Sequence, residues 1–242
     1  MQVSATEMAE KILAGKNIVF LTGAGVSVAS GIPDYRSLKG VYTESGEKEP
    51  EYLLSRRALI ENSKEFHNFV KKLYHKCANP NIIHDALVTL ENNREVTVIT
   101  QNIDGLHSEA GSSRVIEFHG SLASVFCEKC GEQVEQDLFL NDIIHDKCQG
   151  LLRPKIVLYD EQIQFQNIIS SVKAIEQADV VVIVGTTFKV YPFAALIHDT
   201  HPDARIFAVN KEPLQIPELD AWFLGDACEV FERIYEIEGV LR

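Results

Sequence analysis

The sequence predicts a doubly wound α/β domain, and three observations lead to this prediction. Short runs rich in β-branched apolar residues recur along the chain, each about the length of a strand. Segments with helical periodicity lie between several of these runs. The runs are continuously apolar rather than alternating, which is typical of parallel strands covered on both faces. Strand alternating with helix therefore favours a parallel sheet with helices on both sides.

Five segments are predicted as buried strands of this sheet. They are Ile18–Leu21, Val96–Thr100, Val115–Phe118, Val180–Val184 and Ile206–Val209. Valine, isoleucine and phenylalanine dominate them, and these side chains pack well on a pleated surface.

Two segments have the apolar periodicity of a helix. In the first, five side chains follow one helical stripe: Phe66, Phe69, Val70, Leu73 and Tyr74. Asn62, with Glu65 three residues later, resembles a capping box that would begin this helix. In the second, Ile168, Val172 and Ile175 form a stripe just before the strand Val180–Val184.

Two regions depart from the alternation of strand and helix. Residues 37–92 are largely helical around a polar loop, and residues 121–155 are polar and hold four Cys or His residues at metal-like spacing. We interpret them as a helical insertion and a zinc-binding module that form a smaller lobe. The chain, residues 1–242, would be one domain. Its Rossmann-like core would comprise residues 1–36, 93–120 and 156–242.

The composition is that of an ordinary globular protein, with 45% hydrophobic and 24% charged residues in 242. The net charge of −12 disfavours nucleic acid as a partner, because its backbone is anionic. This acidity is either a solvated surface or a long-range attraction for basic substrates.

No apolar run is long enough for a membrane span, and the N-terminus does not resemble a signal peptide. The five cysteines then suggest reduced thiols and a metal site rather than disulfides. We therefore expect a cytoplasmic protein without a membrane or obligate protein partner.

A glycine-rich turn, Thr22–Gly25, follows the first predicted strand. Such a turn lets backbone N–H groups approach a pyrophosphate, and the start of the next helix adds a positive dipole end. However, Val28 stands where the dinucleotide fingerprint has its third glycine, and no acidic residue closes a second strand. From these residues alone, a tight turn without a ligand stays an alternative.

The longer segment Gly23–Arg36, GAGVSVASGIPDYR, closely resembles the nucleotide-binding signature of the sirtuins. Further segments match this family in the same order along nearly the whole chain. They are TQNIDGLH at Thr100–His107, Phe118-His119-Gly120, Gly185-Thr186-Thr187, Val209-Asn210 and Gly225–Cys228. The resemblance implies an NAD-dependent protein-lysine deacylase, which transfers the acyl group from lysine to ADP-ribose and releases nicotinamide.

The resemblance implies His119 as the general base, which would take a proton from a ribose hydroxyl. Its ordinary pKa lies near neutrality, where a general base is most effective. It follows a predicted strand at the edge where ligands bind. A lone histidine can also be a hydrogen-bonded core residue, and the Phe-His-Gly match favours catalysis. Asn102 is the second expected catalytic residue, which would order water or the ribose.

The resemblance also implies a set of residues that bind NAD. They are Gly23, Ala24, Gly25, Ser27, Val28, Asp34, Tyr35, Arg36, Gln101, Ile103, Asp104, Gly185, Thr186, Thr187, Asn210 and Cys228. Gln101 would contact the nicotinamide ribose, whereas Ile103 and Asp104 would hold the carboxamide. A polar turn without a ligand is the alternative for this segment. Tyr35 replaces the usual Phe, and Thr187 replaces a frequent Ser.

Four residues have the spacing of a structural zinc site: Cys127-x2-Cys130, then after 14 residues His145-x2-Cys148. The family usually has four cysteines, and His145 stands in place of the third. We expect one structural Zn²⁺ with a Cys₃His ligand set. The alternative is that zinc is lost and His145 is a surface residue.

In sirtuins the substrate peptide adds as a strand between two segments, which here correspond to Ile156–Glu161 and Thr187–Pro192. The resemblance implies Val157, Leu158 and Tyr159 as peptide-binding residues. Asp160 replaces a usual glycine, so it is either a tolerated loop change or a cause of altered peptide preference. His67 and Val70 stand where members that prefer acidic acyl groups have Tyr and Arg. Succinyl- and malonyl-lysine should therefore be poor substrates.

Two other functions use the same pocket. One is NAD cleavage or ADP-ribosyl transfer without deacylation, which would need no acyl-lysine tunnel. The other is a non-catalytic NAD sensor, against which the presence of His119 and Asn102 counts.

Overall fold

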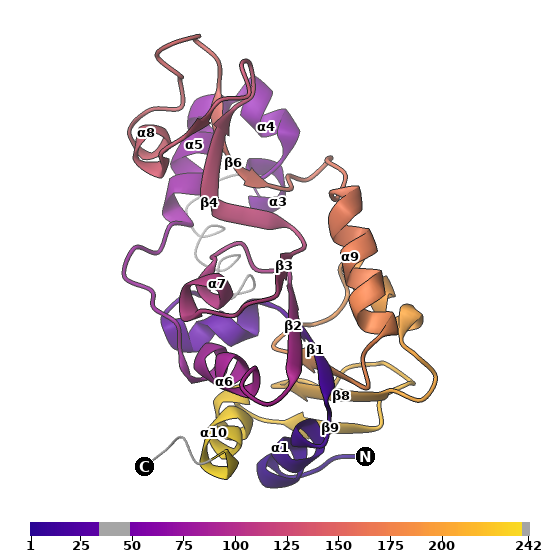
Figure 1. The fold of residues 1–242 in the computed structure, drawn as a ribbon. Coiled ribbons are helices and arrows are strands. Elements are labelled where there is room, and N and C mark those ends of the chain that lie inside the picture. Colours follow the sequence, from indigo (N-terminus) through magenta and orange to yellow (C-terminus); the bar gives the residue numbers. More distant parts are fainter. Residues whose placement is uncertain (34–48, 239–242) are drawn as a thin grey trace.

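The fold is built on a six-stranded parallel sheet, in a computed structural model that describes residues 1–33 and 49–238 (Figure 1). The strand order is β3-β2-β1-β7-β8-β9. The strands are β1 (Asn17–Thr22), β2 (Glu95–Thr100), β3 (Val115–Glu117), β7 (Val180–Val184), β8 (Arg205–Asn210) and β9 (Ala221–Leu224). The five predicted strands are confirmed, and β9 is a sixth that the sequence did not predict.

The chain reverses its winding at β1, which pairs with β2 on one side and with β7 on the other. Phe20 lies opposite Val98 in one register and Val182 in the other. All five pairings are parallel, so the carboxyl ends of the strands lie at one edge of the sheet. In open α/β sheets this edge holds the ligand, beside the strand where the order reverses.

Helices cover both faces of the sheet (Figure 1). On one face pack α1 (Ala5–Leu13), α6 (Ile82–Leu90) and α10 (Ala227–Ile237), and their side chains form one core with β1, β2 and β7. On the other face pack α9 (Phe165–Glu176) and the 3-10 helix η2 (Phe193–Asp199). Ile168 and Val172 of the predicted second stripe pack against this second core, in which Ile175 is buried.

A smaller lobe lies above the edge where β3 ends (Figure 1). It contains an antiparallel sheet of β4 (Gly120–Cys127), β5 (Gln133–Val134) and β6 (Leu152–Ile156). The helices α3 (Pro50–Leu53), α4 (Arg56–Glu61), α5 (Ser63–Lys72) and α8 (Gln136–Asn141) surround it. A third core, which includes Leu59, Phe66 and Phe139, joins these elements. The helix α6 packs on the large sheet instead, and the division of the chain into segments stays a prediction.

The helix predicted from the Phe66–Tyr74 stripe is confirmed as α5, in which Phe66, Phe69 and Val70 are buried. The predicted capping box is wrong within the described residues. The side chain of Asn62 makes no capping bond and donates to the Tyr52 hydroxyl over 2.5 Å. Among the described helices, none is both long and apolar enough to cross a membrane.

Candidate active site

The carboxyl edge of the large sheet brings together most of the residues that the sequence singled out. Gly23 follows β1, Gln101 follows β2, and Gly185 follows β7. His119 stands two residues after β3, and Asn210 is the last residue of β8. Residues separated by up to 187 positions thus share one edge because their strands run in the same direction.

The glycine turn and Gly185 approach each other too closely for side chains. The N–H of Gly25 donates to the carbonyl oxygen of Gly185 over 2.7 Å. A Cβ on Gly25 would lie 2.6 Å from the Gly185 Cα, and Gly185 itself has a φ of +61°. Gly23, Gly25 and Gly185 therefore leave backbone without side chains beside β1, where the strand order reverses, as a bound pyrophosphate requires.

The helix after this turn, η1 (Ala24–Ser30), is a 3-10 helix rather than the start of a long α-helix. Its Val26 N–H donates to Gly23 within the turn, and its Gly25 N–H is taken by Gly185. The expected helix dipole is therefore weaker than that of a regular α-helix.

Three polar side chains form a connected group beside the glycine turn. Ser27 donates its hydroxyl to Asp104 over 2.7 Å, and Asn102 donates its side-chain amide to Ser27 over 3.0 Å and to the Gly23 carbonyl over 3.1 Å. The second oxygen of Asp104 accepts from the Leu106 N–H, so a polar turn is present as well. These bonds fix the segment after β2 against the glycine turn.

His119 is held by the same segment. Its Nδ1 lies 3.2 Å from the carbonyl oxygen of Gln101, which can only accept, so Nδ1 carries the proton and donates. In the neutral ring Nε2 is then left with a lone pair. Burial lowers the pKa of His119, and the bond to Gln101 offsets this in part. The arrangement thus favours a neutral imidazole that can accept a proton through Nε2.

The remaining predicted NAD-binding residues lie around this group. Gln101 donates to Thr186 over 3.5 Å, and Asn210 donates to the Thr186 carbonyl over 3.0 Å. Val28 and Thr187 are exposed, whereas Ala24, Ile103 and Cys228 are partly exposed. Burial, followed by the neighbouring Asp226, raises the pKa of the Cys228 thiol to about 11. Asp34, Tyr35 and Arg36 lie outside the described residues.

The predicted peptide-binding segment begins directly beside His119. The Val157 N–H donates to the His119 carbonyl over 2.8 Å. Next to His119, Gly120 has a φ of +78°, and a Cβ there would lie 2.1 Å from the Lys155 carbonyl oxygen. Only glycine permits this approach. Leu158 is buried and Tyr159 exposed, while Asp160 has a φ of 74°, the conformation that glycine would adopt without strain.

The four predicted zinc ligands form a compact cluster in the smaller lobe. The ligand atoms of Cys127, Cys130, His145 and Cys148 lie within 4.8 Å of one another. The Nδ1 of His145 is 3.3 Å from the Cys148 Sγ and 3.5 Å from the Cys130 Sγ. Ligands about 2.0–2.3 Å from a tetrahedral Zn²⁺ are spaced in this way. These residues could hold one zinc ion. The alternative that His145 is a surface residue is wrong, because its side chain is 1% exposed.

A second group, which no pattern in the sequence indicates, supports the glycine turn. Asn81, which begins α6, donates its amide to the carbonyl of Val26 and to the hydroxyl of Ser30, each over 2.8 Å. Two buried histidines, His84 and His107, lie beneath this region with ring centroids 4.7 Å apart. Asparagine is a typical helix cap, but the contacts of Asn81 to Val26 and Ser30, 55 and 51 residues earlier, leave no local pattern in the sequence.

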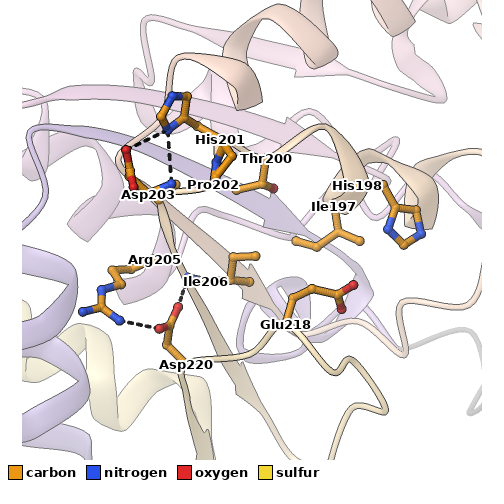
Figure 2. A pocket seen from close by; sticks show the side chains of 11 residues that line it. Ile197, His198, Thr200, His201, Pro202, Asp203, Arg205, Ile206, Glu218 and Asp220 are labelled. Carbon is orange, nitrogen blue, oxygen red and sulfur yellow. Dashed lines mark hydrogen bonds and ion pairs between the residues drawn. The ribbon is translucent and has the colours of Figure 1, made fainter.

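A hollow of about 580 Å³ lies at the opposite edge of the sheet, where β8 begins (Figure 2). Two pairs of charged groups lie in its lining. Arg205 contacts Asp220 over 2.5 Å, and His201 lies 3.8 Å from Asp203. The predicted functional residues lie at the other edge, so we assign the candidate site there.

Fold and site together define a class: a doubly wound dinucleotide-binding domain with a zinc module over its ligand edge. The Sir2 family model matches residues 23–192, more than half of the chain. A relative from Listeria monocytogenes serotype 4b (strain F2365), named NAD-dependent protein deacetylase, is 48% identical over 93% of this chain and 98% of its own. The chain belongs to the Sir2 family.

Solved structures agree with this assignment. A Sir2 homologue in complex with NAD superposes with a TM-score of 0.86 at 30% identity, covering 100% of this chain and 96% of its own. Sir2Tm bound to a propionylated peptide superposes with a TM-score of 0.85 at 27% identity, covering 97% of this chain and 99% of its own. The matches cover both lobes of the molecule.

Proposed function

We propose that the protein is an NAD-dependent protein-lysine deacetylase. It transfers the acyl group of a modified lysine to ADP-ribose and releases nicotinamide. The observation that carries this proposal is the position of His119. Its side chain lies at the dinucleotide edge, and its carbonyl oxygen accepts from Val157, the first of the three residues predicted to bind the peptide. One residue thereby contacts the parts of the site that would hold NAD and peptide.

On the NAD side, the proposal places the phosphates beside the glycine turn and Gly185, where no side chain blocks their approach to the backbone. Asn102 and Asp104 are held by Ser27, so their remaining hydrogen-bonding capacity has a fixed direction. Because both N–H groups of the Asn102 amide are used, its Oδ1 and the carboxylate of Asp104 are the groups that can still accept, from a ribose hydroxyl and from the N–H of a carboxamide. The other predicted NAD-binding residues belong to the same proposal.

His119 would act as the general base on the ribose. Because its Nδ1–H is taken by the Gln101 carbonyl, Nε2 is the atom that accepts the proton. The aromatic rings of Phe118 and Phe193 lie 5.5 and 6.4 Å from its ring, as measured between centroids, and limit its contact with water. The lowered pKa of His119 keeps the ring in the basic form at neutral pH.

The peptide would add as a strand between the segments 156–161 and 187–192, with main-chain hydrogen bonds to Val157, Leu158 and Tyr159. The acyl chain is expected to be uncharged. His67 is buried and its Nε2 contacts the Phe139 carbonyl, while Val70 is fully buried. These two positions thus supply no exposed cation, which supports poor use of succinyl- and malonyl-lysine.

One assay tests this proposal against its alternatives. The protein is incubated with NAD and an acetyl-lysine peptide, and the products are followed by mass spectrometry. Peptide-dependent acetyl-ADP-ribose supports deacetylation. Plain ADP-ribose without peptide would instead indicate NAD cleavage, and the absence of turnover would indicate a sensor.

A cytoplasmic location belongs to the same proposal, because three zinc-binding thiolates favour a reducing compartment.

A further inference from the structure

Four charged side chains form a closed network between the zinc module and the peptide-binding segment. Arg56 begins α4, Glu128 lies between the zinc ligands Cys127 and Cys130, Arg153 lies on β6, and Glu161 ends the peptide-binding segment. Each arginine contacts each glutamate: Arg56 at 2.9 and 3.1 Å, and Arg153 at 3.1 and 2.6 Å.

Arg153 is the centre of this network, and its side chain is only 4% exposed. It donates to Glu161 through two nitrogens, to Glu128 through one of these, and to the backbone carbonyls of Pro154 and Ile156. These contacts use all five N–H groups of the guanidinium. A buried arginine is stable only with such partners, so the loss of either glutamate leaves a charge poorly compensated.

Glu161 connects the network to the backbone of the peptide-binding segment. Its Oε2 accepts from the Leu158 N–H over 3.0 Å. Burial raises the pKa of Glu161, but the bonds from Arg153 and Leu158 outweigh this effect and lower it, so the carboxylate stays charged. Tyr159 forms a parallel bridge with Ser55, in which its carbonyl accepts from the Arg56 N–H over 3.1 Å.

The segment is therefore fixed at both ends. At its start, Val157 is bonded to His119, and at its end Glu161 is bonded to Arg153 and Arg56. Glu128 fixes the two arginines from the other side, since Arg56 donates to both of its oxygens over 2.9 and 3.2 Å. Its own N–H donates to Leu151 in the zinc module.

We propose that Glu128, together with Arg56 and Arg153, positions the peptide-binding segment, so that the loop between Cys127 and Cys130 determines peptide affinity and leaves NAD binding unchanged. This inference rests on the proposed deacetylase function. Glu128 is a positioning residue that acts through the arginines and Glu161. A purely stabilising module would support both substrates to the same extent.

The test compares peptide binding with NAD binding in the full chain that carries Glu128→Gln. The amide keeps the shape of the carboxylate but replaces one acceptor by a donor and removes the charge. We expect the dissociation constant for an acetyl-lysine peptide, measured by calorimetry, to rise about tenfold, because charge-assisted hydrogen bonds are lost. The dissociation constant for NAD should change less than about twofold, and zinc content should stay the same.

The matched control is Glu135→Gln, a change of an exposed glutamate in the same module. It should alter neither constant. Arg56→Gln tests the network from outside the module and should weaken peptide binding while zinc content stays that of the wild type. Unchanged peptide binding in either network variant would overturn the proposal. So would an equal loss of peptide and NAD binding, or a loss of zinc in Glu128→Gln.

The wild-type protein separates this inference from the function on which it rests. If the wild type forms no acetyl-ADP-ribose, the proposed function fails. If it does, and Glu128→Gln binds peptide as well as the wild type, only the positioning role fails.

Discussion

The side-chain amide of Asn81 donates to the carbonyl oxygen of Val26 over 2.8 Å, and this bond ties the glycine turn to the start of α6. A second bond of the same length reaches the hydroxyl of Ser30. The Oδ1 of Asn81 accepts from the Ile83 N–H over 2.9 Å and thereby caps the helix. One side chain therefore has two separable tasks.

Replacing Asn81 by serine separates these tasks. Serine is as good a helix cap as asparagine, but it has no amide to donate to Val26 and Ser30. We expect the KM for NAD to rise about fivefold, from the loss of about 1 kcal/mol of hydrogen bonding, while the KM for peptide stays the same. Steady-state kinetics with each substrate varied in turn measures this. The variant should melt at a temperature close to that of the wild type, because the helix cap is kept. An unchanged KM for NAD would contradict the role of Asn81.

His119→Ala should lower kcat by about 10²–10⁴, the usual contribution of a general base. The rate of the wild type should rise with pH until His119 is neutral and then stay constant, because only the neutral ring accepts a proton. Since burial lowers the pKa of His119, this rise should be complete at a lower pH than for a free imidazole. The profile of kcat/KM against pH measures this rise.

The control for the alanine variant is His198→Ala, a change at an exposed histidine. Undiminished kcat in His119→Ala would exclude His119 as the base.

The zinc cluster predicts one equivalent of Zn²⁺ per chain, measured by elemental analysis. His145→Cys should keep the metal, since thiolate and imidazole both suit a tetrahedral site. His145→Ala should lose most of it and lower the melting temperature, because metal binding and folding are coupled in such modules. Chelation should destabilise the wild type to a similar extent. A wild-type protein without zinc would refute the Cys₃His assignment.

The sequence predicts those parts of the molecule that depend on local patterns. The five central strands are apolar runs, and the zinc ligands have a short, regular spacing. The strand β9 was missed because Ala221–Leu224 is short and contains a tryptophan that is only partly buried. Its place in the sheet depends on pairing with β8 rather than on its own composition.

The contacts that support the site could not be predicted for a related reason. Glu128 and Glu161 meet only because α4 and β6 place Arg56 and Arg153 between them. Asn62, which has the residue pattern of a capping box, bonds to Tyr52 because α3 and α4 bring that hydroxyl within reach. Such contacts between residues distant in sequence outweigh local preference, and no local pattern in the sequence indicates them.

The buried pair His84 and His107 predicts a loss of stability in mild acid. Burial, and then the neighbouring His84, lowers the pKa of His107 to about 3, and burial lowers the pKa of His84 as well. His107 therefore stays neutral in the folded protein down to a pH of about 3, whereas a histidine of the unfolded chain binds a proton below a pH of about 6.5. The stabilising effect is thus complete above that pH and is lost as the pH falls toward 3. His107 alone should lower the free energy of unfolding by about 1 kcal/mol between pH 7.5 and 5.5. Urea unfolding at both pH values measures this loss of stability.

The variant His107→Asn can still form a hydrogen bond to Thr22 but does not titrate, so its loss of stability between the two pH values should be smaller. His201→Asn is the control for removing one exposed histidine, and an equal loss in His107→Asn and the wild type would show that His107 has no part in it.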